Sequence, residues 1–161
     1  MKVEELKIYQ QLKIYDRYKF IVVNNQSQKR LEKPDRVEVE YLINELGYQS
    51  KYYNKENLFQ IRETNSNIDF IFNIILRHGR IEPVFFANSK VDGTKIGSVL
   101  MRICKQLDME KGIERPESIG AATFSSYKEL KKILSDLLDL YEDFKREVSL
   151  IWLEIGSAKE D

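Results

Sequence analysis

The stretch SYKELKKILSDLLDLYEDFKREVSLIWLE, residues 126–154, decides what fold this chain can adopt. Side chains three and four positions apart share one face of an α-helix, so apolar residues at that spacing predict one helix with a continuous apolar stripe. Such a helix would be roughly 43 Å long at about 1.5 Å per residue, longer than a domain of this size is wide. We therefore expect another surface to cover its overhanging end. The stripe consists of Tyr127, Leu130, Leu134, Leu137, Tyr141, Phe144, Val148 and Ile151.

The start of this helix is also marked. Ser126 with Glu129 three residues later forms the pattern of a capping box, in which each residue bonds a free backbone amide of the first turn. We assign the long C-terminal helix to residues 125–155 and a disordered tail to residues 156–161.

Residues 1–33 are predicted to form an N-terminal helix, from Val3 to about Tyr18, followed by a polar loop. The apolar residues of this helix lie on several sides, which is typical of a helix packed between neighbours. The run from Phe20 to Val23 either extends it or forms a short strand, because periodicity does not separate the two.

A second helix begins after Pro34, where Asp35 and Glu38 suit the first turn. Gly47 is the expected stop at its end. Its buried stripe is Val39, Leu42, Ile43 and Leu46.

The middle of the chain changes to a period of two, which is typical of strands. Four β-rich runs cover residues 48–53, 58–63, 68–76 and 81–87, and short polar links join them. Short links require antiparallel neighbours, so we predict a four-stranded meander. The third run is apolar on both faces, which places it at the centre of the sheet.

A third helix is expected after the turn at residues 91–94, with residues 108–118 as a surface loop behind it. Its stripe would be Ile96, Val99, Leu100, Ile103 and Leu107. The predicted fold is therefore a single α+β domain, an antiparallel four-stranded meander packed with three to four helices. Residues 34–124 form its helix-meander-helix core.

The composition excludes several classes of protein. The chain has 161 residues, of which 42% are hydrophobic and 32% charged, as in a globular domain. Its 26 basic and 26 acidic residues cancel, so no net field attracts nucleic acid or a membrane, and we expect neither as partner. No apolar run suits a signal peptide or a membrane span, and Cys104 has no disulfide partner, so we expect a cytoplasmic protein.

No catalytic, metal or cofactor site is predicted. His78 is the only histidine and falls in a hairpin turn, where solvent exposure is its ordinary environment. The segment 93–98 has the glycines and lysine of a phosphate loop in the wrong order, and we expect Gly97 to let a helix pack closely on the sheet. We therefore expect a non-enzyme that needs no cofactor.

Two surface features are candidates for partner binding. One flank of the long helix carries an acidic stripe, which is either a solvated face or a surface complementary to a basic partner. Tyrosine is enriched at recognition surfaces, and three tyrosines cluster in the first strand, a possible sheet edge, although core packing is an equal alternative. The candidate residues are Asp136, Asp139, Glu142, Asp143 and Glu147 on the helix, and Tyr48, Tyr52 and Tyr53 on the strand.

The segment from Phe124 to Leu130, FSSYKEL, with its continuation LYEDFKRE over residues 140–147, is similar to the closing helix of small immunity proteins of bacterial polymorphic-toxin systems. This resemblance covers the last third of the chain. It implies a protein that neutralises a toxin by occupying its active surface, with an acidic flank suited to a basic nuclease toxin.

Two other functions remain open at this stage. The chain could be a structural or assembly protein that homodimerises through the end of its long helix, with Val148, Ile151 and Trp152 as the contact. A small enzyme would instead require a deep polar pocket near residues 94–98.

Overall fold

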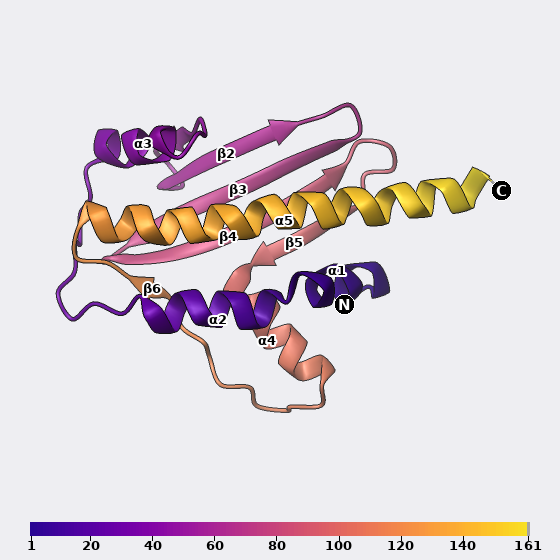
Figure 1. The fold of residues 1–161 in the computed structure, drawn as a ribbon, viewed down its shortest axis with the longest axis horizontal. Coiled ribbons are helices and arrows are strands. Elements are labelled where there is room, and N and C mark those ends of the chain that lie inside the picture. Colours follow the sequence, from indigo (N-terminus) through magenta and orange to yellow (C-terminus); the bar gives the residue numbers. More distant parts are fainter. Residues whose placement is uncertain (161) are drawn as a thin grey trace.

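The computed structural model describes the backbone of residues 1–160 and the side chains of residues 1–156. Over this part of the chain, helices pack against one antiparallel sheet, which is the α+β fold that the sequence predicts. Figure 1 shows α1, α2, α3 and α5 on one side of the sheet, with the long α5 lying across it. The core is the layer between these helices and the sheet.

The sheet begins as the predicted meander, in the order β1-β2-β3-β4, and continues into β5. A short β6 pairs with the start of β4. The strand β3 is central and β1 is an edge, as expected. The strands are β1 (Lys51–Tyr53), β2 (Leu58–Thr64), β3 (Ile68–Arg77), β4 (Arg80–Ser89), β5 (Lys95–Val99) and β6 (Ala122–Thr123).

The prediction of a helix from residue 95 onward is wrong for its first five residues. Residues 95–99 form β5, and α4 (Leu100–Glu110) begins only after it. Ile96 pairs with Ala87 on the helix-covered face, so a strand buries it as well as a helix would. Gly97 was expected to let a helix pack closely on the sheet, but it lies within β5 instead. It has φ +113°, and a Cβ there would lie 2.0 Å from the carbonyl oxygen of Phe85 on β4. Only glycine fits this approach of two strands.

The N-terminal helix is two helices rather than one. A single residue, Lys13 with φ 52°, separates α1 (Val3–Leu12) from α2 (Ile14–Asn24). The Lys13 amide closes α1 by bonding the carbonyls of Gln10 and Tyr9. The run from Phe20 to Val23 extends α2 and forms no strand.

The helix α3 (Arg36–Glu45) follows its prediction closely. The Asp35 carboxylate accepts hydrogen bonds from the amides of Val37 and Glu38 and caps the first turn. Gly47 has φ +92°, the left-handed conformation that ends a helix.

The helix α5 (Tyr127–Glu160) has no break near Leu140, and its stripe from Leu130 to Ile151 is buried. Rings of its stripe meet rings of the sheet: the Tyr141 centroid lies 5.4 Å from that of Phe72. Residues 156–160 belong to α5, although a disordered tail was expected there. Residue 161 lies outside the described residues. The buried sector is wider than one stripe because α1, α2 and α3 flank α5. It also includes Ile133, Leu138 and Leu140.

Candidate functional site

The acidic stripe of α5 is exposed on the outside of the molecule, but part of it is used within the fold. The Asp143 carboxylate lies 2.7 Å from Arg17 on α2 and 2.7 Å from Arg146 one turn further along α5. Glu142 lies 2.7 Å from the Lys145 ammonium and accepts a hydrogen bond of 2.6 Å from the Tyr48 hydroxyl. These two carboxylates hold α5 to its neighbours, so they are poor candidates for partner contacts.

The other three carboxylates form no ion pair with any described side chain. Asp139 is exposed, and Asp136 and Glu147 are partly exposed. Burial against α5's neighbours, together with the nearby Asp139 charge, raises the pKa of Asp136 above its usual value, although Lys132 opposes this. The outer ridge of α5, defined by Asp136, Asp139 and Glu147, is therefore a surface of unneutralised negative charge.

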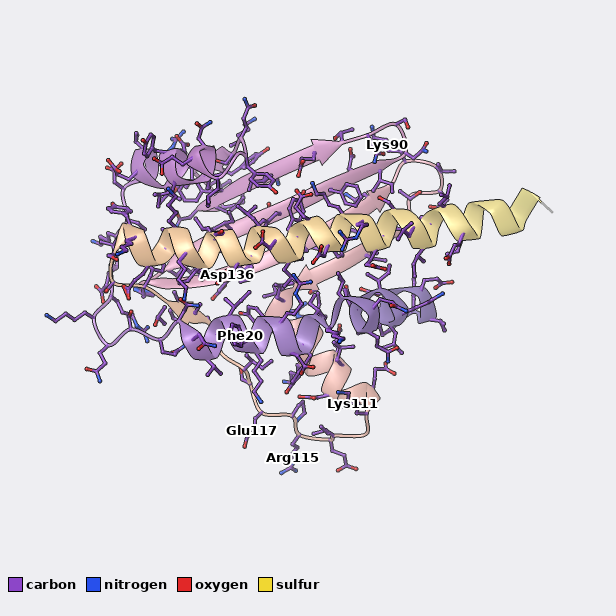
Figure 2. The ribbon with its side chains drawn as sticks, viewed as in Figure 1. Phe20, Lys90, Lys111, Arg115, Glu117 and Asp136 are labelled. Atoms are coloured by element: carbon purple, nitrogen blue, oxygen red, sulfur yellow. The ribbon has the colours of Figure 1, made fainter. Side chains whose placement is uncertain are left out.

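An exposed aromatic ring lies beside this ridge. Phe20 on α2 is 68% exposed, and Val23 one turn further along α2 is 64% exposed. Arg17 bonds Asp143 and Ser27 bonds Glu129, so the segment 14–27 runs antiparallel to α5. Phe20 is therefore level with the middle of the ridge, and Figure 2 shows it on the helix next to that of Asp136.

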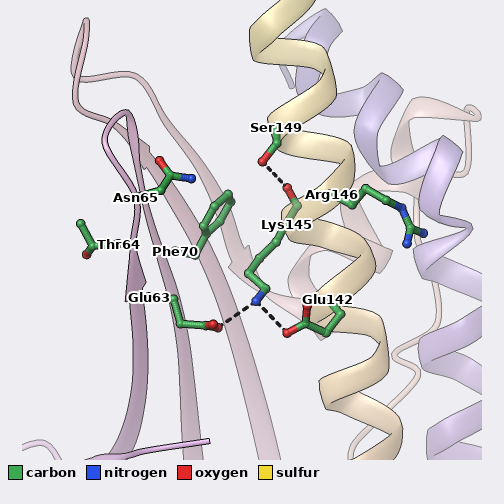
Figure 3. Close-up of a pocket in the computed structure, with 8 residues that line it drawn as sticks. All are labelled: Glu63, Thr64, Asn65, Phe70, Glu142, Lys145, Arg146 and Ser149. Atoms are coloured by element: carbon green, nitrogen blue, oxygen red, sulfur yellow. Dashed lines mark hydrogen bonds and ion pairs between the residues drawn. The ribbon is translucent and has the colours of Figure 1, made fainter.

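A cleft opens on the opposite flank of α5, between this helix and the end of β2 (Figure 3). Its volume is about 430 Å³. The Lys145 ammonium lies in it, 3.0 Å from Glu63 on β2 and 2.7 Å from Glu142. Both carboxylates hold this ammonium, so it joins α5 to β2 within the fold. The remaining lining residues are Thr64, Asn65, Phe70, Arg146 and Ser149.

Two tyrosines lie next to this ion-pair cluster. Burial and the hydrogen bond to Glu142 raise the pKa of the Tyr48 hydroxyl. Burial and the negative charge of Glu63 raise the pKa of Tyr141, whose hydroxyl forms no hydrogen bond of normal geometry. Burial alone would raise the pKa of Glu142, but the bonds from Lys145 and Tyr48 lower it below its usual value. Burial and the neighbouring carboxylates therefore disfavour ionisation of both phenols, and the cluster joins α5 to β2 and to the segment before β1.

The three candidate tyrosines do not form one patch. Tyr48 and Tyr52 lie on the helix-covered side, where both pack against the core. The Tyr52 ring lies 4.9 Å from that of Phe59 and under the Arg36 guanidinium. Tyr53 points to the other face of the sheet, under the Lys51 ammonium. Alternation along β1 separates neighbours in this way.

The predicted dimer contact is not available at two of its three positions. Val148 and Ile151 are buried within the chain, at 0% and 6% exposure, because α1 covers this part of α5. Trp152 is partly buried against the same core. The exposed apolar residues of this end are instead Leu150, at 49%, and Leu153, at 69%.

The other candidate groups have structural environments. His78 is an exposed turn residue with φ 54°. Burial raises the pKa of the Cys104 thiol to about 12, which removes the thiolate that reactive cysteines need. Among the described residues, no three acidic, histidine or cysteine side chains are grouped as metal ligands would be. None of the described helices has both the length and the apolar character needed to cross a membrane.

Comparisons with known proteins add no relative to this description. Neither family models, nor curated proteins, nor solved structures gave a match to the chain.

Sequence reasoning identified Glu142 and Tyr48 separately, and the structure brings them together. Sequence reasoning missed Phe20, Glu63 and Lys145. The signal for Phe20 was present, because a helix extended through residues 20–23 places this ring on the side away from Tyr18 and Ile21, which are buried. The pairing of Glu63 with Lys145 had no signal, since the two residues are 82 positions apart.

Proposed function

We propose that this chain is a non-catalytic protein-binding domain and that its recognition surface is the outer ridge of α5 together with Phe20. The observation that carries the proposal is an exposed ring beside carboxylates that lack ion-pair partners in the described structure. An apolar anchor inside a charged rim is the usual anatomy of a protein-binding surface.

The partner's chemistry follows from the charge of the ridge. Unpaired carboxylates speed association with a basic surface and repel an acidic one. A basic toxin domain fits this requirement, and the similarity of the closing helix to those of polymorphic-toxin immunity proteins favours it. The proposed activity is then occlusion of the toxin's active surface, which needs no catalytic group on this chain.

The test is binding with a charge-reversed ridge. The tagged chain captures its partner from the source cells, and the affinity is then measured with purified proteins. We expect Asp139→Lys with Glu147→Lys to weaken binding at least about tenfold, mainly through slower association and most strongly at low salt. Phe20→Ala should weaken it through faster dissociation.

The matched control is Glu56→Lys with Glu117→Lys. This variant has the same change of net charge, and both positions are exposed away from α5. Equal affinity of the ridge variant and the wild type, or equal losses in ridge and control variants, would contradict the proposal. If the partner is a toxin, co-expression of the wild type should restore growth and the ridge variant should not.

Self-assembly is a second candidate, favoured by one observation. Leu150 is 49% exposed in the C-terminal half of α5. If the chain dimerises there, Leu150→Glu should change a dimer to a monomer in light scattering. A wild type that is monomeric at all concentrations would exclude this candidate.

A further inference from the structure

The second face of the sheet has no helix on it in the described structure. Residues that pair across β1 to β5 alternate between the two faces, and those opposite the α5 layer form what we call the open face. Most of its apolar residues are partly exposed, unlike the buried residues that face α5, and only Val84 among them is buried, at 5% exposure. The apolar residues of the open face are Tyr53, Leu58, Ile71, Ile75, Val84, Phe86 and Val99.

Positive charge surrounds this apolar centre. Strand alternation places four basic and two acidic side chains on the open face, an excess of two positive charges in a chain of zero net charge. One of the acids, Asp69, lies 3.2 Å from Arg62 and 3.8 Å from Lys90, so its charge is already neutralised. The basic rim consists of Lys51, Arg62, Arg77 and Lys95, and the acids are Asp69 and Glu82, whereas Arg80 lines a hollow beside α2.

The chemistry of the centre distinguishes two kinds of acidic partner. A single-stranded nucleic acid needs exposed rings on which bases stack. Each of the two rings here has one of the chain's own lysines over one of its faces. The Lys95 ammonium lies 4.2 Å from the Phe86 ring centroid, and the Lys51 ammonium lies 5.1 Å from the Tyr53 ring centroid. Between them the surface is aliphatic, which suits the side chains of a protein.

We infer that the open face is a second docking surface, and that its occupant is a protein with an acidic, partly apolar surface. The apolar centre contributes the area removed from water, and the basic rim selects the sign of the partner's charge. This surface lies on the opposite side of the sheet from the ridge of α5 and does not depend on the function proposed for the ridge. The two surfaces would allow the chain to hold a basic and an acidic protein at the same time.

The test uses the full chain and a defined probe. The probe is a fluorescent random copolymer of glutamate and tyrosine, and binding is followed by anisotropy at several salt concentrations. We expect binding that weakens as salt rises, and Lys51→Glu with Lys95→Glu should weaken it at least about tenfold. Ile71→Gln, which changes no charge, should weaken it about threefold or more, because it removes apolar contact.

A matched control separates the face from net charge. Lys105→Glu with Lys132→Glu has the same net charge, and both residues are exposed on helices away from the open face. This control should bind like the wild type. Far-UV circular dichroism and urea unfolding identify a rim variant that does not fold, in which case Lys51→Gln with Lys95→Gln replaces it.

Four results would overturn the inference. The first is that the copolymer does not bind, and the second is that the rim and control variants lose affinity for it equally. The third is that an oligo-dT strand binds more tightly than the copolymer and depends on the same rim residues. The fourth is self-association that the rim variant abolishes, which would make a second copy the occupant. Failure of the ridge experiment would leave this one intact, because the variants lie on opposite sides of the sheet.

Discussion

The two faces of the sheet are built from the same strands and yet differ in every property that matters for function. On β3, Phe72 and Ile74 face α5 and have no exposed surface, while their neighbours Ile71 and Ile75 face outward and are partly exposed. The covered face is buried and rich in aromatic rings, whereas the outer face mixes apolar, amide, basic and acidic groups. A strand that is apolar on both sides therefore does not imply two covered faces. Its second side can be a surface that another molecule covers.

The largest expected difference is between two neighbouring isoleucines of β3. Ile74→Ala removes a side chain that is fully buried, and we expect a loss of about 3 kcal/mol in the free energy of unfolding. Ile75→Ala, the same change on the open face, should cost about 1 kcal/mol because this side chain is already partly hydrated. Urea unfolding of both variants measures the two values.

The wild type provides the reference slope for this pair. Both variants should keep its dependence of unfolding free energy on urea, since neither changes the fold. Equal losses in the two variants would mean that the open face is covered in solution by a part of the chain or by a second copy.

Two glycines give the next largest contrast. Gly97→Ala places a Cβ against the Phe85 carbonyl, between two strands, and should cost at least about 2 kcal/mol. Gly93→Ala also has positive φ but has open space around it, so its cost should stay near 1 kcal/mol. Thermal unfolding compares them, and equal melting temperatures would show that β4 and β5 can separate without loss.

The fold could be predicted from the sequence where one periodicity was clear. The alternation along residues 68–76 gave the faces of β3, and the spacing in residues 126–154 gave α5. It failed at residues 95–99, because Ile96, Val99 and Leu100 have a helical spacing, whereas the strand places Ile96 and Val99 on opposite faces of the sheet. The prediction also failed at Lys13, where α1 ends and α2 begins without a glycine or proline to mark the interruption of the helix.

The candidate site was predictable only as a list of residue types. The sequence gave the acidic stripe but not which of its members are paired, because Arg17 and Asp143 are 126 positions apart. The open face had a sequence signal in the alternation of Arg62, Ile71 and Phe86 with buried neighbours. Its lack of a covering helix depends on where α1 to α5 pack, which local patterns do not determine.

The start of α5 gives a prediction that depends on pH. Hydrogen bonds from the Ser125 and Ser27 hydroxyls and the Ser125 amide lower the pKa of Glu129 to about 2, against 4.5 without them. A carboxyl whose pKa is lower in the folded state stabilises the fold above pH 4.5, and this contribution is lost as pH falls from 4.5 towards 2. Glu129→Gln should therefore be less stable than the wild type at pH 7, with a difference that shrinks towards pH 2.

Urea midpoints at a series of pH values test this relation. Ser27→Ala removes one of the donors and should reduce the same pH dependence in part. A difference between wild type and Glu129→Gln that is constant with pH would mean that the carboxylate does not anchor α5 through its charge.

The smallest expected effect concerns the ion pair that ties α2 to α5. Both side chains of the pair Arg17 and Asp143 are about one-third exposed, so a double-mutant cycle with alanine should give a coupling of only about 0.5 kcal/mol. Asp143 keeps Arg146 as a partner when Arg17 is removed, which limits the loss further. The same substitution has a separate use for the ridge: Arg17→Ala leaves the ridge more negative without altering a carboxylate. A basic partner should then bind faster at low salt, whereas a partner that recognises only Phe20 should show no change in association rate.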